Sequence, residues 1–334
     1  MDPISASETA PNTTLDDGNQ KFWTTFYKNL EILNTVTVTL YSIIFILGII
    51  GNGLVIWIAG FRMKKMISAV WFLHLAIADL MCCLSLPLPI VEMGYSTTVC
   101  QTSLPRHFCS FNLVLFNLNM SASVLLLTAM SIDRWVSVMW PFWAKVHRRQ
   151  KLVRITAGII WVLSLVWSGF MVFLLGWYGL FTAGHYTNNT YKLLRLFLMF
   201  AFPFHIISAC YITIFYKIKT RNRPQSSQRP YRIITAVILC FFICWAPYYI
   251  WPLAIPYSRS LLQNFTVDVI VKCLVYLNSC INPIIYVYMG QDFRHRFLIS
   301  IPFRMENALS EPPDEPCREG GDHEHSPNVD VSPC

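Results

Sequence analysis

Charged side chains are scarce in this chain. Asp, Glu, Lys and Arg make up only 13% of its 334 residues, whereas 54% of the residues are hydrophobic and 15% are aromatic. A typical soluble domain carries about 25% charged residues. The composition therefore excludes an ordinary soluble protein and indicates a chain that crosses a membrane several times.

Other signals are missing as well. The first 33 residues are polar and contain no charged leader with an apolar core, so we expect no cleaved signal peptide and a first span that serves as its own anchor. The sequence shows no paired catalytic acids and no cluster of metal ligands, which argues against an enzyme. It also shows no internal repeat, and an odd number of spans disfavours the two-fold architecture of many transporters.

Seven apolar stretches are each long enough to cross a hydrocarbon core, which takes about 20 helical residues. They lie near residues 34–61, 67–92, 108–138, 153–175, 192–218, 231–254 and 266–289. The predicted fold class is an all-α membrane protein with a seven-transmembrane helix bundle. We divide the chain into an extracellular N-terminus (1–33), the bundle (34–289), an amphipathic helix on the inner membrane surface (290–304) and a disordered cytoplasmic tail (305–334).

The positions of the basic residues predict the orientation. Lys and Arg gather in alternate connections, within residues 62–65, 145–154, 217–232 and 294–304. By the positive-inside rule these segments face the cytoplasm, so the N-terminus is extracellular in a multi-pass plasma-membrane protein. The net charge of +8 is thus explained without a nucleic-acid partner. Three glycosylation sequons, at Asn12, Asn188 and Asn264, fall on the side predicted to be extracellular.

Only two of the eleven cysteines, Cys100 and Cys109, are expected on the extracellular side. They lie before and at the start of the third span. The two either pair with each other across a short loop or stay free, and sequence alone leaves both alternatives open.

Five polar residues inside the spans form a candidate ion site. Asp79 lies in the middle of the second span, where a carboxylate needs either a cation or hydrogen-bond donors. Asn119 and Ser123 are four residues apart and share one helix face, as do Asn278 and Asn282. If the helices bring these oxygens to Asp79, they make a site for a small hard cation such as sodium. The alternative is interhelical hydrogen bonding, worth about 0.6–2 kcal/mol per bond.

Further polar and kinked positions suggest moving parts. The neighbours Asp133 and Arg134, at the cytoplasmic end of the third span, are expected to hold each other until adjacent helices move. Trp245 lies just inside the bend that Pro247 introduces into the sixth span, and Pro283 kinks the seventh. A boundary ion pair and an aromatic core residue are the simpler alternatives.

One element in each span resembles the rhodopsin-like (class A) G-protein-coupled receptors. In chain order these are Gly51-Asn52, Leu75 to Asp79, Asp133-Arg134, Trp161, Pro203 with Tyr211, Cys244-Trp245-Ala246-Pro247 and Asn282-Pro283-Ile284-Ile285-Tyr286. Seven such elements in the correct order are very specific. More narrowly, Leu47 to Met63 and Met289 to Phe297 look like the formyl peptide receptors and their chemoattractant relatives.

The resemblance implies a switching mechanism. It assigns activation roles to Asp133, Arg134, Tyr211, Phe241, Trp245, Pro247, Pro283 and Tyr286, and an allosteric sodium ion to Asp79. An agonist from outside is expected to shift the ring of Trp245, after which the sixth span swings outward. Arg134 then meets two tyrosines beside a docking G-protein helix. This is a population shift between two packings of the bundle.

A ligand pocket is expected at the outer end of the bundle. Arg195 matches a basic ligand-binding position of the formyl peptide receptors, and Lys272 lies above the kink of the seventh span. Two cations over aromatic rings favour an anionic group, such as a peptide carboxylate or a lipid acid. For Lys272 the alternative is snorkelling to lipid headgroups. The other expected pocket residues are Phe116, Asn117, Tyr248, Tyr249 and Tyr276.

These observations predict a chemoattractant-type receptor that binds an extracellular peptide or acidic lipid and activates an inhibitory-class heterotrimeric G protein. Arrestin binding is expected to be weak, because Ser310, Ser326 and Ser332 are the tail's only phosphate acceptors. A chemosensory receptor of the same family is one alternative. A non-signalling or scavenging receptor is another, suggested by the unusual Trp135 after Arg134 and by a second outer loop without cysteine.

Overall fold

The computed structural model describes residues 13–63, 66–94, 106–177, 189–220, 229–254 and 261–289. Its α-helices are α1 (Thr13–Trp57), α2 (Ile67–Leu84), α3 (Pro87–Gly94), α5 (Arg106–Met139), α6 (Pro141–His147), α7 (Gln150–Trp177), α8 (Asn189–Leu196), α9 (Phe202–Thr220), α10 (Arg229–Ala254) and α11 (Leu261–Met289). Two π-helical segments, η1 (Ile58–Arg62) and η2 (Phe197–Ala201), interrupt the first and fifth spans. The predicted surface helix at 290–304 and tail at 305–334 lie outside the described residues.

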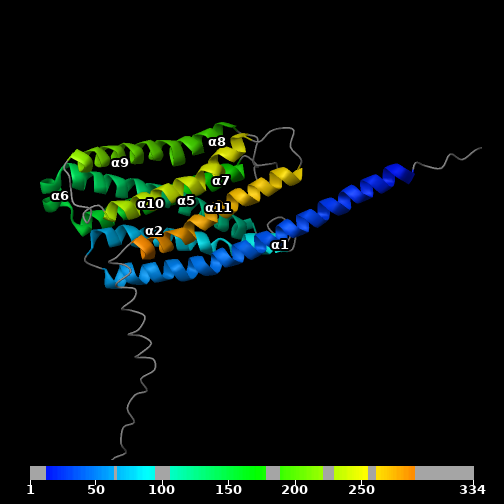
Figure 1. Cartoon of the computed structure of the whole chain (residues 1–334), viewed down its shortest axis with the longest axis horizontal. Coiled ribbons are helices and arrows are strands. Elements are labelled where there is room, and N and C mark those ends of the chain that lie inside the picture. The colour runs from blue at the N-terminus through cyan, green and yellow to red at the C-terminus, as the bar shows by residue number, and fades with distance from the viewer. Residues whose placement is uncertain are drawn as a thin grey trace, which may run out of the picture.

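The predicted seven-transmembrane bundle is confirmed. Seven stretches of helix are long and apolar enough to cross a membrane: Gln20–Arg62, Ile67–Gly94, Cys109–Met139, Gln150–Phe173, Lys192–Thr220, Ile233–Ala254 and Leu262–Tyr286. They lie side by side (Figure 1). The first and last residues of these stretches agree with the predicted spans to within a few residues, except at the start of the first span.

The first helix is much longer than its apolar pattern predicts. α1 runs without a break for 45 residues. At about 1.5 Å per residue this corresponds to roughly 68 Å, about twice the thickness of a hydrocarbon core. The N-terminal part of α1 therefore projects beyond the other helices, as Figure 1 shows. The predicted start near residue 34 marks only where α1 joins the bundle, since Asn34 and Thr37 are its first buried residues.

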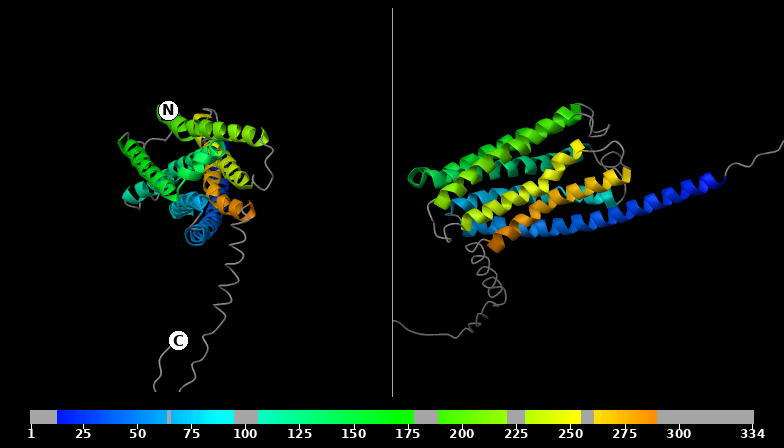
Figure 2. Two further views of the ribbon diagram at one scale, coloured as in Figure 1. Left: turned by 90° about the vertical axis from the view of Figure 1, so that its left-hand side faces the viewer. Right: turned by 45° about the horizontal axis from the view of Figure 1, so that its top comes forward.

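The helix α5 runs through the interior of the bundle. It contacts α2, α7 and α9, and the end-on view in Figure 2 shows the other helices arranged around it. Its middle section is buried on nearly every side, from Leu118 to Val124. Residues placed on α5 therefore face several other helices at once.

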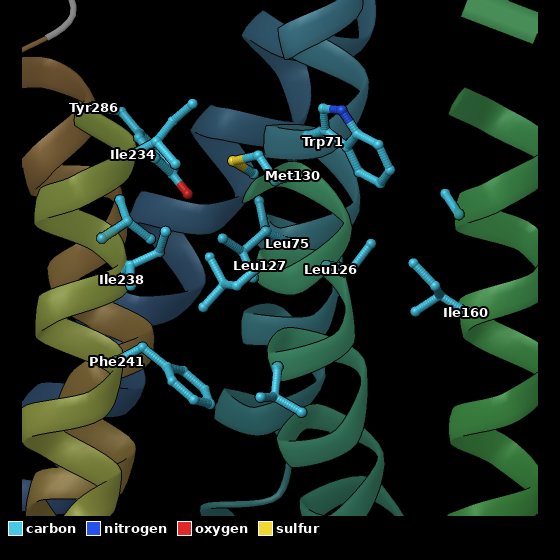
Figure 3. Close-up of a cluster of buried hydrophobic side chains, with 14 of the residues drawn as sticks. Trp71, Leu75, Leu126, Leu127, Met130, Ile160, Ile234, Ile238, Phe241 and Tyr286 are labelled. Carbon is cyan, nitrogen blue, oxygen red and sulfur yellow. The ribbon is translucent and has the colours of Figure 1, made fainter. Parts of the chain in front are cut away.

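Apolar side chains fill the half of the interior that lies around the C-terminal part of α5. In Figure 3, Leu127 and Met130 of α5 lie between α10 and α11 on one side and α2 on the other, while Leu126 points toward Ile160 of α7. Each of these α5 side chains is at most 1% exposed. Because this layer is closely packed, a displacement of α10 must repack the side chains beneath it.

Small residues and prolines set the local shape of the helices. A Cβ atom at Gly51 of α1 would lie 3.1 Å from Cγ of Pro283, so a glycine here lets α1 approach the kinked part of α11. In the fifth span, the backbone N–H of Phe202 bonds to the carbonyl of Phe197, one residue farther back than in an α-helix. This π-turn adds a residue just before Pro203 and changes the direction in which the preceding turn points.

Candidate functional site

Asp79 lies at the centre of a polar cluster between α2, α5 and α11. Its side chain is completely buried. Asn282 of α11 donates from Nδ2 to one carboxylate oxygen at 2.8 Å, and Asn119 of α5 donates from Nδ2 to the other at 3.4 Å. The structure thus brings together side chains that are 40 and 203 residues apart in sequence. The predicted convergence on Asp79 is thus present for Asn119 and Asn282, whereas neither side-chain polar atom of Asn278 makes a hydrogen bond.

Several atoms of this cluster have unused hydrogen-bonding capacity. Asn119 Nδ2 also donates to Ser123 Oγ at 3.4 Å, in line with their predicted shared face. Among the described residues, six buried amide oxygens on α1, α5 and α11 accept no hydrogen bond, and four of them belong to this region of the bundle: Oδ1 of Asn52, Asn119, Asn278 and Asn282. An unsatisfied buried polar atom costs about 1–3 kcal/mol. The cluster is therefore arranged to receive something more than its own donors.

Two further residues belong to the cluster although the sequence-based site did not include them. Asn52 of α1 donates from Nδ2 to the backbone oxygens of Ser279 at 2.9 Å and Gly48 at 3.0 Å. The side chain of Ser279 in turn approaches the Asp79 carboxylate. Both are polar residues within apolar spans, and this signal was available in the sequence. Asn52 therefore ties α1 to the kinked region of α11.

At the inner end of α5, Asp133 and Arg134 have different partners, which corrects the expectation that they hold each other. The carboxylate of Asp133 receives two hydrogen bonds from Arg148, from Nε at 2.7 Å and from Nη2 at 2.6 Å. Arg134 donates from Nη2 to Ser68 Oγ at the start of α2. Consecutive helical residues point in different directions, so the two side chains face different neighbours. No pattern in the sequence indicated Ser68 or Arg148 as partners.

The two tyrosines expected to meet Arg134 lie on different helices. Tyr286 of α11 is only 2% exposed, and its ring centroid lies 4.7 Å from that of Phe72 in α2. Figure 3 places Tyr286 in the same layer of the interior as Met130 of α5 and Ile234 of α10. Tyr211 lies partly buried on α9 against the same core. In this packing, Arg134 donates a hydrogen bond to Ser68.

Above this layer, aromatic rings surround Trp245 of α10. Trp245 is completely buried although Pro247, two residues on, is only partly buried. Its ring centroid lies 5.7 Å from Phe241, 5.9 Å from Phe116 and 5.7 Å from Tyr248. These separations are typical of aromatic pairs that contribute about 0.5–1.5 kcal/mol beyond buried area. Two of the predicted switch residues, Phe241 and Trp245, therefore lie in one connected set of rings with two of the predicted pocket residues, Phe116 and Tyr248.

Arg195 covers the outer end of these rings. It lies near the end of α8, just before the π-turn η2, and its guanidinium carbon is 4.5 Å from the ring centroid of Tyr248 and 5.4 Å from that of Tyr249. Its Nη1 also donates to the hydroxyl of Tyr248 at 3.3 Å. The arginine is held by cation–π contact with its planar group partly exposed. The structure therefore joins Arg195 and Tyr248 as predicted, and η2 decides the direction of the arginine.

The remaining predicted pocket residues have distinct surroundings. Phe116 contacts Tyr276 at 5.8 Å, and Tyr276 contacts Tyr41 of α1 at 5.4 Å. Asn117 is only 3% exposed and donates to the carbonyl of Leu113 in its own helix at 2.8 Å. Phe116 thus belongs to the ring set, whereas the amide of Asn117 is committed to α5.

Lys272 has an acidic partner that the predicted site did not include. Its ammonium lies 2.7 Å from a carboxylate oxygen of Asp268, one turn earlier in α11. The two side chains are 43% and 25% exposed. The spacing of four residues was visible in the sequence and typically permits such a pair. The outer end of the bundle therefore holds a partly neutralised lysine and an arginine stacked on rings.

Of the residues predicted to be extracellular, Cys109 and Asn264 are among the described residues. Cys109 is disulfide-bonded. Cys100, its predicted partner, lies outside the described residues, as do Asn12 and Asn188, so their pairing and glycosylation stay predictions. Asn264 lies in the first turn of α11, where its Oδ1 atom is buried. A sequon within a helix is less accessible than one in the surface loop that the prediction assumed.

Comparison with known proteins agrees with this geometry. Residues 51–286 match the family described as 7 transmembrane receptor (rhodopsin family). Formyl peptide receptor 2 of Mus musculus is 35% identical over 315 residues, with 86% of this chain and 88% of the relative covered. Chemerin-like receptor 1 of Sus scrofa is 37% identical over 315 residues, with 84% of each chain covered. C5a anaphylatoxin chemotactic receptor 1 of Danio rerio is 34% identical over 326 residues, with 91% and 92% covered.

These relatives are similar over nearly their whole length, so the likeness is not confined to a few motifs. The matched region contains the Asp79 cluster, Arg134 and the rings around Trp245. The relatives named above are receptors, in agreement with the prediction that the chain is not an enzyme. The chain belongs to the rhodopsin family of seven-transmembrane receptors, among the chemoattractant-type G-protein-coupled receptors.

Proposed function

We propose that the protein senses an extracellular peptide or acidic lipid and activates an inhibitory-class heterotrimeric G protein. One observation carries this proposal. Arg195 stacks on Tyr248 at 4.5 Å, Tyr248 contacts Trp245 at 5.7 Å, and Trp245 contacts Phe241 at 5.7 Å. A ligand that moves Arg195 therefore acts on a buried ring that packs directly above the cytoplasmic half of α10.

An acidic ligand group suits the outer end of this path. The guanidinium of Arg195 binds carboxylates with two parallel hydrogen bonds, which the geometry of a lysine does not provide. Tyr248 supplies a hydroxyl beside it. Lys272 contributes less to anion binding, because Asp268 already balances its charge. We therefore assign the anion-binding role mainly to Arg195.

A sodium ion fits the Asp79 cluster. The Asp79 carboxylate can bind the ion together with Oδ1 of Asn119 and Asn282 when these amides turn their oxygens toward it in place of Nδ2, which gives the oxygen ligands that hard cations prefer. When bound, the ion supplies positive charge opposite the buried Asp79. The residues of the cluster hold α2, α5 and α11 together in this packing, so a ligand that favours another packing weakens ion binding.

The cytoplasmic face offers a docking surface for a G protein, given an extracellular N-terminus as the basic connections indicate. The short helix α6 presents three exposed apolar side chains, with Phe142 87%, Trp143 52% and Val146 63% exposed. It follows α5 directly and precedes Arg148, which holds Asp133. Exposed apolar residues grouped in this way mark an interaction site. The inhibitory class rests on the resemblance to formyl peptide receptors.

The proposal is tested with the full chain in cells or nanodiscs together with an inhibitory-class G protein. Formylated peptides, unformylated peptides with a free carboxyl terminus and fatty acids serve as probes, and nucleotide exchange is the readout. For an activating acid, Arg195→Gln should lower potency by about tenfold or more, whereas the amide analogue of the same probe should lose little. Equal losses for the acid and its amide would contradict the carboxylate role.

A variant at the inner end of the bundle distinguishes a signalling receptor from a scavenging receptor. Arg134→Ala should abolish ligand-stimulated exchange while leaving ligand binding measurable, because Arg134 lies far from Arg195 along α5 and α8. If the wild-type protein binds a probe but never stimulates exchange, the signalling proposal is wrong and the scavenging alternative is supported.

A further inference from the structure

A groove opens between the inner ends of the first, second and fourth spans, away from the Asp79 cluster and the aromatic rings. Its volume is about 300 Å³, at the small end of ligand pockets. The lining residues come from η1 with its following turn, from α2 and from α7: Ala59, Gly60, Met63, Met66, Ala69, Val70, Leu73, His74, Arg154 and Gly158. None of the lining residues is acidic, and only His74 and Arg154 are polar.

Two glycines keep this groove open. A Cβ atom added to Gly158 of α7 would meet no heavy atom within 4 Å, and one added to Gly60 of η1 would meet only Cδ1 of Leu73 at 3.8 Å. The π-turn that closes η1, in which Met63 N–H bonds to the carbonyl of Ile58, widens the helix beside the groove. The space is therefore a consequence of local sequence on two facing helices, and not a packing defect of large side chains.

The polar groups of the groove present only donors. Trp161 donates from Nε1 to Nδ1 of His74 at 3.1 Å. Because an indole nitrogen cannot accept, Nδ1 is the acceptor and the proton of the neutral imidazole lies on Nε2. Arg154, exposed near the start of α7, adds a permanent positive charge. His74 lies seven residues into α2, about 10 Å deeper than the helix start at the membrane boundary.

We propose that this groove binds an anionic glycerophospholipid of the inner leaflet, such as phosphatidylserine. Arg154 receives the phosphate at the membrane surface, His74 Nε2–H receives an ester carbonyl deeper in, and an acyl chain lies along Gly60, Leu73 and Gly158. Arg62 and Lys151, exposed within a turn of lining residues, favour a headgroup with net negative charge. The assignment to the inner leaflet rests on the orientation given with the proposed function.

A sterol explains the groove less well. It would fill apolar space and offer one hydroxyl, but it gains little from a permanent cation or from a second donor farther inside. A phospholipid instead places acceptors at both depths, one charged and one neutral. Its charge is complementary to Arg154, since a phosphate–guanidinium pair is charge-assisted.

The test measures lipid binding to the purified full-length receptor by native mass spectrometry. Dioleoyl-phosphatidylserine and dioleoyl-phosphatidylcholine are titrated separately, without agonist or G protein. We expect one phosphatidylserine site that Arg154→Gln weakens by about tenfold and Gly158→Leu removes. The control Gly169→Leu, three turns along α7 on nearly the same face, should bind like wild type, because a Cβ atom there also meets nothing within 4 Å.

Three outcomes would overturn the proposal: phosphatidylserine binding that neither groove variant changes, equal losses for phosphatidylserine and phosphatidylcholine, or loss with Gly158→Leu but not with Arg154→Gln. The last pattern would indicate a sterol or another neutral occupant, which titration with cholesterol then identifies. A diazirine-labelled phosphatidylserine should crosslink to peptides containing Leu73 or Gly158, and protease protection of sealed vesicles reads the orientation separately. The proposal of lipid binding and the proposal of signalling can therefore be contradicted independently of one another.

Discussion

The rings around Trp245 and the cluster around Asp79 lie in neighbouring layers of one bundle, yet they are built in opposite ways. The ring layer is closed, because Trp245 is fully buried and contacts Phe116, Phe241 and Tyr248. The Asp79 layer is equally buried, but its amide oxygens lack donors. The ring layer is filled by side chains and leaves one buried donor of Trp245, Nε1, without a hydrogen bond, whereas the Asp79 layer has several amide oxygens that an ion or water can satisfy.

This difference separates two tasks. A closed set of rings transmits a displacement, since close-packed side chains cannot move singly. An incomplete polar cluster responds to what occupies it, because binding there removes the cost of unsatisfied atoms. The two layers meet at α10 and α11, whose packing against each other joins them. The receptor thus has a stiff element above an adjustable one.

The largest effect is expected from opening the closed layer. Trp245→Ala should lower the free energy of unfolding by about 3–5 kcal/mol and abolish the ligand response, because it leaves a large cavity at the centre of the rings. Thermal unfolding in detergent and nucleotide exchange measure the two effects. Trp23→Ala, in the projecting part of α1 with 47% exposure, is the control and should unfold near the wild-type temperature. Equal destabilisation by both variants would show that the rings are not specially packed.

A second change asks whether the polar layer is loosely packed or only short of donors. Gly48→Ala places a Cβ atom 2.2 Å from Sγ of Cys83, beside the turn that positions Asn52. We expect a loss of about 1–3 kcal/mol in unfolding free energy from overpacking. Gly53→Ala, whose Cβ meets nothing within 4 Å, should instead stabilise α1 by about 0.5–1 kcal/mol. If neither variant lowers the free energy of unfolding, α1 shifts to make room for the added methyl group, and the cluster is loosely packed.

The third change removes the charge of the polar layer and keeps its shape. Sodium should lower agonist affinity by about tenfold in the wild type, and Asp79→Asn should remove this dependence because it removes the cation's anionic ligand. Agonist competition in sodium chloride and in N-methyl-glucamine chloride measures the effect. A salt response that persists in the variant would exclude Asp79 as the ion ligand.

The smallest effect is expected from a change at Ser68, which belongs to neither layer. Ser68→Ala removes the partner that holds Arg134 in this packing. Loss of one hydrogen bond of about 1 kcal/mol should raise basal exchange roughly fivefold. Ser68→Thr keeps the hydroxyl and should behave like wild type. Basal exchange that does not change in Ser68→Ala would mean that this bond does not restrain the inactive packing.

Much of the Asp79 cluster was predictable from sequence. A carboxylate in an apolar span needs partners, and Asn119 with Ser123 lie on one face of their helix because they are four residues apart. The pair of Lys272 and Asp268 has the same spacing of four residues, although the predicted pocket included only the lysine. Local spacing therefore carries real information about partners within a helix.

Partners on different helices were less predictable. Adjacent Asp133 and Arg134 suggested a pair, but the side chains diverge around α5 toward Arg148 and Ser68. The direction of Arg195 depends on η2, where one extra residue rotates the preceding turn. No pattern in the sequence announced this π-turn. Both cases depend on helix rotation, which short motifs do not specify.

The sequence by itself determined the seven spans, the carboxylate of Asp79 within one of them and the positions of Pro247 and Pro283 inside α10 and α11, because hydropathy and backbone chemistry are local properties. Only the tertiary structure decided which side chains meet across helices, such as Asn52 with the backbone of Ser279, and where Gly60 and Gly158 leave a groove. The physical reason is that contacts between helices depend on their relative rotation and separation. These are set by the packing of the whole interior around α5.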